Sequence, residues 1–302
     1  MHVAEIGGVR TRYWVGGEGP PLLLVHGLGG AAVNFADLAP LLARRHRVLV
    51  PDLPGHGGSD RLAALAGLGD LGAHAVAVAE RERMLPAALV GYSMGGVVAL
   101  RLAAARPESV TALAMIAPGG IVSATRRGRI WLAVVSALRP ARAVARARRP
   151  IARRPNLRLP VFGFWGAADP RRLTPEGVLG LLEAQPEHTD VPAAARALVR
   201  DDPRPDLHRV RCPTLLVWGA RDRLVPLSDG FEYARRLRCP IRVLPAAGHL
   251  VVGEYADETA ALLEAFLDEV AEDGWLDRVG EVDELPREVE ALGDPRRERL
   301  HP

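Results

Sequence analysis

The sequence predicts an α/β protein with a mostly parallel central sheet flanked by helices. Short apolar runs alternate with longer helical patterns, which is typical of successive βαβ units. The runs are apolar at consecutive positions, as expected for strands buried on both faces of a parallel sheet. The 302 residues, 48% hydrophobic and 25% charged, are long enough for one large domain or two modest ones. This composition also excludes a disordered or fibrous chain.

The elements expected in the first 120 residues alternate between strand and helix. Continuous apolar runs indicate buried strands, and apolar residues at spacings of three and four indicate helices. A cluster of proline and glycine over 51–58 requires a loop. The expected strands are 22–25, 48–50, 87–90 and 111–116, and the expected helices are 35–44, 74–84 and 94–105.

The pattern changes between 121 and 208, where the sequence is rich in arginine and proline and shows no clear strand. Alternation then resumes with strands at 214–218 and 241–244 and helices at 228–237 and 254–272. The simplest organisation is one core interrupted by a helical insertion. The expected parts are a core of 1–120 and 209–272, an insertion of 121–208, and a charged tail of 273–302 with a short helix near 284–292.

Charge is unevenly distributed, although the formal net charge is only +3. All 39 basic residues are arginine, and eleven of them lie between Arg126 and Arg158, where there is no Asp or Glu. The segment 272–302 has ten acidic residues against five arginines. For the basic insertion we favour the interpretation that its arginines form a solvated face and that its apolar residues line the inner side. The alternatives are attraction of anionic substrates, a membrane-surface patch, and contact with the acidic tail.

Other classes of protein are excluded by simple features. No apolar run approaches the roughly 20 residues of a membrane-spanning helix, so we expect no stable membrane insertion. The first residues lack the pattern of a secretory signal, which favours a cytoplasmic protein. Only two cysteines are present, which excludes a disulfide scaffold and a zinc ribbon. We expect no metal, no organic cofactor and no nucleic-acid partner.

A candidate nucleophile lies in the turn between a strand and a helix. The segment Gly91-Tyr92-Ser93-Met94-Gly95 follows the strand 87–90 and opens the helix 94–105. Glycines two residues before and after Ser93 remove side chains that would collide in so tight a turn. The turn projects the serine Oγ beyond the carboxyl edge of the sheet, where open α/β sheets bind ligands. An ordinary serine in a glycine-rich turn is the alternative, and the flanking strand and helix favour the nucleophile.

A base and an acid are expected on the same edge of the sheet. His249 follows the strand 241–244, and Asp222 follows the strand 214–218, so both lie in loops beside the predicted serine. A serine needs such a pair to become a strong nucleophile. Asp169, in Gly166-Ala167-Ala168-Asp169, is a weaker candidate for the acid because it lies inside the insertion and follows no clear strand.

With these motifs the chain resembles the α/β-hydrolase family, in its serine esterase and lipase-like branch, over about 9–272 apart from the insertion. His26-Gly27-Leu28-Gly29-Gly30 resembles the family's His-Gly loop, and Asp52 to Asp60 resembles its Asp-x-x-Gly-x-Gly-x-Ser segment. The resemblance implies that the backbone N–H groups of Leu28 and Met94 form an oxyanion hole. It also implies structural roles for His26 and His56, and a cap formed by 121–208.

The chemistry implied by the resemblance is hydrolysis of small-to-medium carboxylic esters through an acyl-enzyme on Ser93. His249 would move the proton, Asp222 would orient the imidazole, and turnover should fall as His249 becomes protonated on acidification. Leu28, Met94, Val225 and Leu250 are the expected substrate contacts. Haloalkane dehalogenases and epoxide hydrolases of this family have an aspartate as the nucleophile, so the serine at position 93 argues against both.

Several functions remain open on the same residues. They are a lactonase, a carbon–carbon bond hydrolase, a thioesterase or acyltransferase, a cofactor-free perhydrolase and a non-catalytic protein that retains the fold. Leu250 departs from the tryptophan that often follows the catalytic histidine in meta-cleavage-product hydrolases, which disfavours carbon–carbon cleavage. The expected partner is a small acyl ester, and the expected state is a monomer or homodimer. Family strand order brings Cys212 and Cys239 near one another, and we expect free thiols.

Overall fold

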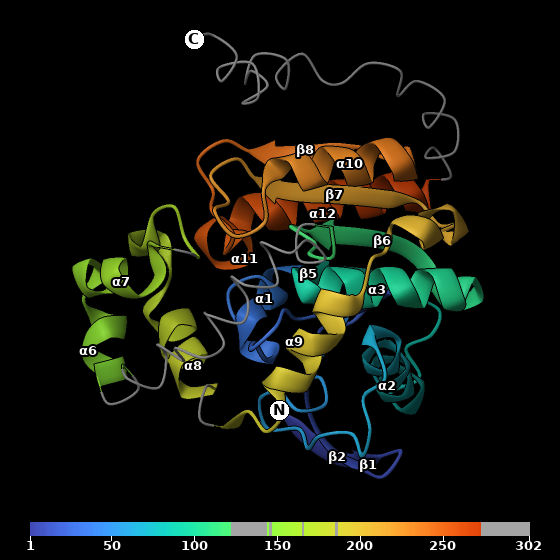
Figure 1. The fold of residues 1–302 in the computed structure, drawn as a ribbon, viewed down its shortest axis with the longest axis horizontal. Helices are drawn as coiled ribbons and strands as arrows, with labels where there is room; N and C mark the ends of the chain where they lie inside the picture. The colour runs from blue at the N-terminus through green and yellow to red at the C-terminus, as the bar shows by residue number, and fades with distance from the viewer. Residues whose placement is uncertain (122–143, 145–146, 165, 185–186, 273–302) are drawn as a thin grey trace, which may run out of the picture.

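The computed structural model describes residues 1–121, 144, 147–164, 166–184 and 187–272 (Figure 1). The predicted tail helix near 284–292 and most of the arginine-rich stretch lie outside the described residues. The described residues form an eight-stranded sheet in the order β1-β2-β4-β3-β5-β6-β7-β8. The strands are β1 (His2–Ile6), β2 (Val9–Gly16), β3 (Pro21–Val25), β4 (Arg47–Pro51), β5 (Ala87–Tyr92), β6 (Val110–Ile116), β7 (Thr214–Gly219) and β8 (Ile241–Leu244).

The six strands from β3 to β8 are parallel, as the apolar runs predict. Successive residues of β3 point to opposite faces of the sheet, where Leu23 enters one apolar cluster and Leu24 the other. Both side chains are fully buried because helices cover both faces. The carboxyl ends of β5, β7 and β8 therefore meet at one edge of the sheet, as the predicted site requires.

The amino-terminal hairpin is absent from the prediction. Strands β1 and β2 pair antiparallel, and β2 pairs antiparallel with β4. Gly7 and Gly8 join them with φ of 58° and 76°, values that glycine adopts without steric cost. The hairpin extends the parallel sheet at one edge and leaves Val3 exposed.

Helices cover the two faces of the sheet in separate groups (Figure 1). One face packs against α2, α3 and α10, and the other packs against η1, α1, α11 and α12. Their bounds are α2 (Leu68–Arg81), α3 (Met94–Ala105), α10 (Leu227–Leu237), η1 (Ala32–Phe35), α1 (Ala39–Leu42), α11 (Val251–Glu254) and α12 (Ala256–Ala271), with a further short turn η2 (Pro107–Ser109).

Three predicted helices differ from the observed ones. The expected helix over 35–44 is two short helical turns, η1 and α1, that do not join. Helix α2 begins six residues before the expected start, because the Asp70 carboxylate accepts hydrogen bonds from the backbone of Ala66 and Gly67. The expected helix over 254–272 is α12, which starts two residues later because Tyr255 separates it from the short helix α11.

The described secondary structure of the segment between β6 and β7 is helical, with turns and irregular residues between the helices. It contains α6 (Arg148–Arg153), α7 (Pro155–Phe162), η4 (Pro170–Arg172), α8 (Pro175–Ala184), α9 (Val191–Arg200) and η6 (Arg204–Arg209), and no described residue of it is in a strand. Figure 1 shows α6, α7 and α8 together to the left of the sheet. The division into core, cap and tail stays a prediction.

Two further expectations concern the membrane and the cysteines. Among the described residues, no helix is both long and apolar enough to cross a bilayer. Cys212 and Cys239 are free thiols, one half-buried and the other buried. Both belong to the apolar cluster beneath α10, and burial raises their pKa to about 11 and about 12 respectively. Buried thiols of this kind are poor nucleophiles, since the thiolate is the reactive form.

Candidate active site

Ser93 lies at the turn between β5 and α3 with a backbone that L-residues rarely adopt. Its φ is 56° and its ψ is −119°. The glycines around it are required by close contacts, because a Cβ on Gly95 would lie 2.0 Å from the Val25 oxygen. A Cβ on Gly91 would lie 2.4 Å from the Gly95 oxygen. The Ser93 N–H donates to the Ile116 oxygen at 2.9 Å, which ties the strained residue to β6.

The structure brings the three predicted residues together from three loops. His249 Nε2 lies 3.0 Å from Ser93 Oγ, and His249 Nδ1 lies 2.7 Å from Asp222 Oδ2. The side chains of His249 and Asp222 are only 3% and 0% exposed. The other carboxylate oxygen, Asp222 Oδ1, accepts the N–H groups of Leu224 and Val225, each at 2.8 Å. This carboxylate is therefore fixed by its own loop as well as by the imidazole.

The predicted oxyanion loop lies directly against Ser93. A Cβ on Gly27 would lie 3.0 Å from Ser93 Cβ and 3.5 Å from Ser93 Oγ. Leu28 is the next residue in the chain, directly after this close approach. Met94 is the first residue of α3 and is fully buried. Neither the Leu28 N–H nor the Met94 N–H donates a hydrogen bond to another residue of the described chain. Of the other expected substrate contacts, Val225 and Leu250 are buried.

His26 and His56 hold loops beside the site and do not reach Ser93. His26 Nε2 accepts the Leu53 N–H at 2.9 Å, and its Nδ1 pairs with the Gly27 oxygen at 2.8 Å. The centre of the His56 ring lies 5.2 Å from that of the His26 ring, with the two planes tilted by 56°, and His56 Nδ1 pairs with the Pro54 oxygen at 3.1 Å. Burial lowers the pKa of His26 to about 4 and that of His56 to about 3, so both imidazoles are neutral.

The Asp52 carboxylate organises the loop after β4. It is fully buried and accepts the Ala32 N–H, the Arg12 Nε–H and the Gly58 N–H at 2.6 to 2.9 Å. The Ser59 hydroxyl donates to the Asp52 backbone oxygen at 2.8 Å. The aspartate and serine of this sequence segment thus shape a loop.

Asp169, the weaker candidate for the acid, does not approach the imidazole. Its carboxylate pairs with Arg171 at 2.7 Å and accepts the Arg171 backbone N–H. This arginine lowers the pKa of the Asp169 carboxyl. Asp169 nevertheless contacts the site through its backbone.

Glu254 is a site residue that the sequence interpretation missed. Its carboxylate is buried and accepts the Gly248 N–H at 2.8 Å and the Asp169 N–H at 2.6 Å. Burial raises the pKa of this carboxyl. Glu254 thereby joins the loop that carries His249 to the segment between α7 and η4. A lone acid ending the apolar run from Leu250 was the signal available in the sequence.

A second missed residue supports Ser93 from the other side. The Tyr233 hydroxyl, fully buried on α10, donates to the Gly119 oxygen at 2.6 Å. The Gly119 N–H in turn donates to the Ser93 oxygen at 3.2 Å. No sequence pattern distinguishes Tyr233 from an ordinary core residue of an amphipathic helix.

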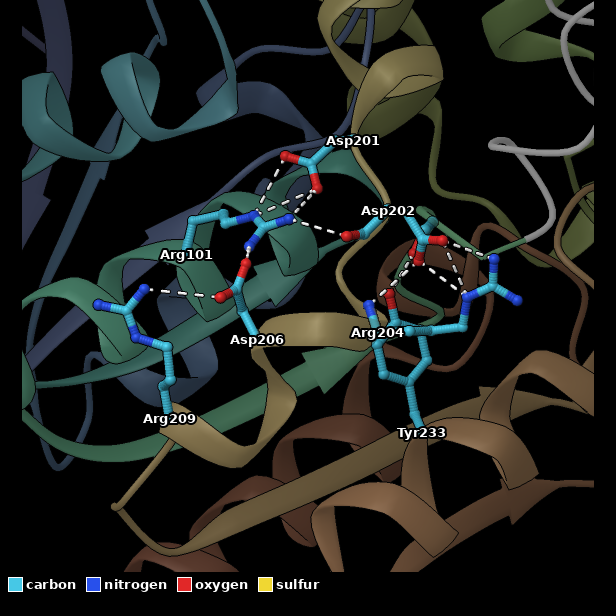
Figure 2. Close-up of polar contacts among 8 residues, drawn as sticks. Arg101, Asp201, Asp202, Arg204, Asp206, Arg209 and Tyr233 are labelled. Carbon is cyan, nitrogen blue, oxygen red and sulfur yellow. Dashed lines mark hydrogen bonds and ion pairs between the residues drawn. The ribbon is translucent and has the colours of Figure 1, made fainter.

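Arg101 binds the segment that runs from the end of α9 into η6 (Figure 2). Its guanidinium contacts the Asp201 carboxylate at 2.6 Å, the Asp206 carboxylate at 2.5 Å and the Asp202 backbone oxygen at 3.1 Å. Arg101 lies on α3, the helix that begins beside Ser93. Helix α3 and the segment that leads from α9 towards β7 are therefore joined by one side chain.

The chain is similar in sequence to known proteins of the alpha/beta hydrolase family. A model of the alpha/beta hydrolase family matches residues 22–262. A dihydrolipoyllysine-residue acetyltransferase component of an acetoin cleaving system from Pseudomonas putida is 33% identical over 87% of this chain and 68% of its own length. A pimeloyl-[acyl-carrier protein] methyl ester esterase from Chromobacterium violaceum is 32% identical over 77% of this chain and 88% of its own length. A 2-hydroxy-6-oxo-6-phenylhexa-2,4-dienoate hydrolase from Burkholderia cepacia is 29% identical, with coverage of 83% and 88%.

Solved structures show the same architecture. A membrane phospholipase A superimposes with a TM-score of 0.70 and 28% identity, over 89% of this chain and 86% of its own. An enol-lactonase from Burkholderia xenovorans LB400 superimposes with a TM-score of 0.69 and 22% identity, over 89% and 100% of the two chains. A meta-cleavage product hydrolase is as similar, with a TM-score of 0.69, 24% identity and coverage of 89% and 98%.

Proposed function

Because this chain belongs to the alpha/beta hydrolase family, we propose that it is a serine hydrolase that cleaves small-to-medium carboxylic esters through an acyl-enzyme on Ser93. The observation that carries the proposal is the unbroken series of contacts from Asp222 through His249 to Ser93 Oγ, at 2.7 and 3.0 Å. A serine hydroxyl is a weak nucleophile alone, and this series supplies the base and the orienting acid.

In the first half of the reaction, Ser93 Oγ attacks the acyl carbon while His249 Nε2 accepts the serine proton. The charge that develops on the imidazole is stabilised by the buried Asp222 carboxylate, which already accepts two backbone N–H groups and needs no reorganisation. The carbonyl oxygen becomes an oxyanion, which the N–H groups of Leu28 and Met94 would stabilise. His249 then returns the proton to the leaving alcohol, and the acyl group remains on Ser93.

In the second half, water replaces the alcohol. His249 accepts a proton from the water as it attacks the acyl carbon, and the tetrahedral intermediate forms at the same oxyanion position. Collapse of the intermediate releases the carboxylic acid and returns the proton to Ser93 Oγ. The reaction is balanced as ester plus water giving acid plus alcohol.

We further propose that 121–208 is a cap over this site. The support is the contact of its described parts with the site loops. The Leu250 N–H donates to the Gly166 oxygen at 2.8 Å, and a Cβ on Gly180 would lie 2.0 Å from Val33 of η1. The relatives named above include an esterase, a carbon–carbon hydrolase and an acetyltransferase component, so the acyl donor and acceptor need direct measurement.

The test is a series of p-nitrophenyl esters of increasing acyl length, assayed with the native chain and with Ser93→Ala. We expect a preference for short or medium chains and a loss in kcat/KM of about a thousandfold or more in the variant. A fluorophosphonate probe should label Ser93 in the native chain. Ser109→Ala, which changes a serine of η2 beyond the far end of α3, should retain activity and labelling. Turnover by Ser93→Ala at the native rate would contradict the proposal.

A further inference from the structure

An exposed apolar and basic surface is formed by α6, α7 and the residues that follow them. Large apolar side chains are exposed at few places in the described chain, and three of these lie within eight residues, at Leu157, Leu159 and Phe164. Their exposed fractions are 39%, 43% and 78%. We name this surface the α6–α7 patch, and it consists of Arg149, Arg153, Arg154, Leu157, Leu159 and Phe164.

The orientation of α7 makes the exposure a fixed property of the structure. The inner side of the helix is held by Arg158 and Phe162, which are 2% and 3% exposed. The Arg158 guanidinium donates to the backbone oxygens of Ala152 and Leu173. The helix therefore buries a charged residue and leaves the leucines on either side of it in solvent. Large apolar side chains exposed close together in a chain often mark an interaction site.

The charge of the patch is positive and uncompensated by the described residues around it. No carboxylate in the described part of the chain pairs with Arg149, Arg153 or Arg154. The sequence has no acidic residue between Glu108 and Asp169, so none lies in the stretch of chain that carries these arginines. Arginines around exposed leucine and phenylalanine match the interface of an anionic bilayer, where the head groups are negative and the layer beneath them is apolar.

The patch also adjoins the candidate active site. The Arg223 guanidinium, next to Asp222, donates to the Gly163 oxygen at 3.3 Å. The Gly166 oxygen accepts the Leu250 N–H, next to His249. Phe164 thus lies between two residues that contact the loops of the acid and the base. A surface bound at the patch would be close to the nucleophile.

We propose that the α6–α7 patch binds peripherally to the surface of an anionic lipid bilayer. Bilayer binding brings the active site to acyl esters held in or on the lipid. The part of the proposal that concerns substrate delivery rests on the proposed function, whereas the binding itself does not. An acidic protein partner, such as an acyl carrier protein, is the alternative occupant that the experiment distinguishes.

The test is co-sedimentation of the full chain carrying Ser93→Ala with phosphatidylcholine vesicles, with or without phosphatidylglycerol. We expect binding to the anionic vesicles, weak binding to the neutral ones and release by salt. Arg153→Gln and Arg154→Gln should each lower the partition coefficient about fivefold, and Phe164→Ser should lower it on both vesicle types. The matched controls are Arg61→Gln and Val3→Ser, which change an exposed arginine and an exposed apolar residue elsewhere. Thermal unfolding of each variant checks that it is folded.

The outcomes separate the two proposals. Equal binding to both vesicle types, no binding to either, or equal losses in the patch and control variants would overturn membrane docking. Binding to an acidic acyl carrier protein without binding to vesicles would overturn it as well. Because Ser93→Ala is used, vesicle binding is measured without turnover. Failure of the fluorophosphonate probe to label native Ser93 would count against the proposed function alone.

Discussion

At the scale of one residue, the Glu254 carboxylate fixes the backbone of the loop that carries His249. The His249 loop has only one residue, Leu250, between the imidazole and α11, so its backbone must be held from outside. Glu254 accepts the Gly248 N–H and the Asp169 N–H through separate oxygens. A buried carboxylate is costly unless its hydrogen bonds are complete, and these two bonds offset part of that cost. We therefore regard Glu254 as a positioning residue for His249.

Replacement of Glu254 tests this role. Glu254→Leu leaves one buried and one half-buried N–H group without this acceptor. A buried N–H without a partner costs about 1–3 kcal/mol and a half-buried one costs less, so the unfolding midpoint should fall. We expect kcat on a p-nitrophenyl ester to fall more than KM changes, because the imidazole loses its support. Glu254→Gln keeps one carbonyl acceptor and should show a smaller loss. A Leu variant that is destabilised but retains native kcat would limit Glu254 to a structural role.

At the scale of elements, Arg101 joins helix α3 to the segment that returns from α9 (Figure 2). Its side chain is 20% exposed and binds two carboxylates and a backbone oxygen. Arg106, on the same helix region, forms a single ion pair with Glu80 in which both side chains are more than half exposed. The two arginines have the same charge and differ mainly in the burial and number of their contacts.

This difference between the two arginines predicts different losses of stability when each is replaced by glutamine. Arg101→Gln should lower the free energy of unfolding by about 1.5–3 kcal/mol, because several charge-assisted hydrogen bonds are lost together. Arg106→Gln should change it by less than about 1 kcal/mol, the usual range of an exposed ion pair. Urea denaturation of the two variants, followed by circular dichroism, measures both values. Equal effects would mean that the contacts of Arg101 add nothing to the fold beyond surface charge.

The sequence predicts most accurately the elements in which consecutive residues are buried. Strands β3 to β8 and helix α3 were predicted within about two residues, since an apolar run on both faces of a sheet is unambiguous. The hairpin β1–β2 was missed because it alternates polar with apolar residues at the edge, although Gly7-Gly8 marked its turn. The helix expected over 35–44 was wrong: its apolar residues pack on the sheet from two turns, which periodicity alone does not distinguish from one helix.

The candidate site could also be predicted only in part. Ser93, Asp222 and His249 follow strands whose carboxyl ends meet, so topology brings them together. Tyr233, Arg101 and Glu254 come from helices. Tyr233 and Glu254 bond to backbone groups of loops, whereas Arg101 binds two carboxylates and one backbone oxygen about a hundred residues away in the sequence. Such contacts depend on how helices pack on the sheet and leave no periodic pattern.

At the scale of the whole molecule, buried neutral histidines link stability to pH. Burial lowers the pKa of His26 to about 4 and that of His56 to about 3, from 6.5. As the pH falls below 6.5, the unfolded chain binds protons that the folded chain excludes, so the free energy of unfolding falls. Above that pH both states are neutral at these positions. Burial raises the pKa of Glu254, which acts in the opposite direction at lower pH.

We therefore expect the urea midpoint to fall between about pH 6.5 and about pH 5, where the histidines dominate. His56→Asn retains an N–H donor for the Pro54 oxygen and should make this slope shallower. His208→Asn, at an exposed position on η6, is the matched control and should leave the slope unchanged. Urea unfolding at several pH values measures all three. A slope that His56→Asn leaves as steep as in the native chain would contradict the role given to His56.

The chain that leaves β6 and the chain that returns to β7 lie side by side. Gly120 leaves β6 and Pro203 approaches β7, and a Cβ on Gly120 would lie 3.0 Å from the Pro203 ring. An insertion whose ends meet can be exchanged without moving the strands on either side. If 121–208 is a cap as proposed, this segment could be exchanged between relatives as a cassette. Substrate preference would travel with the cassette, while the reacting groups stay behind on the sheet.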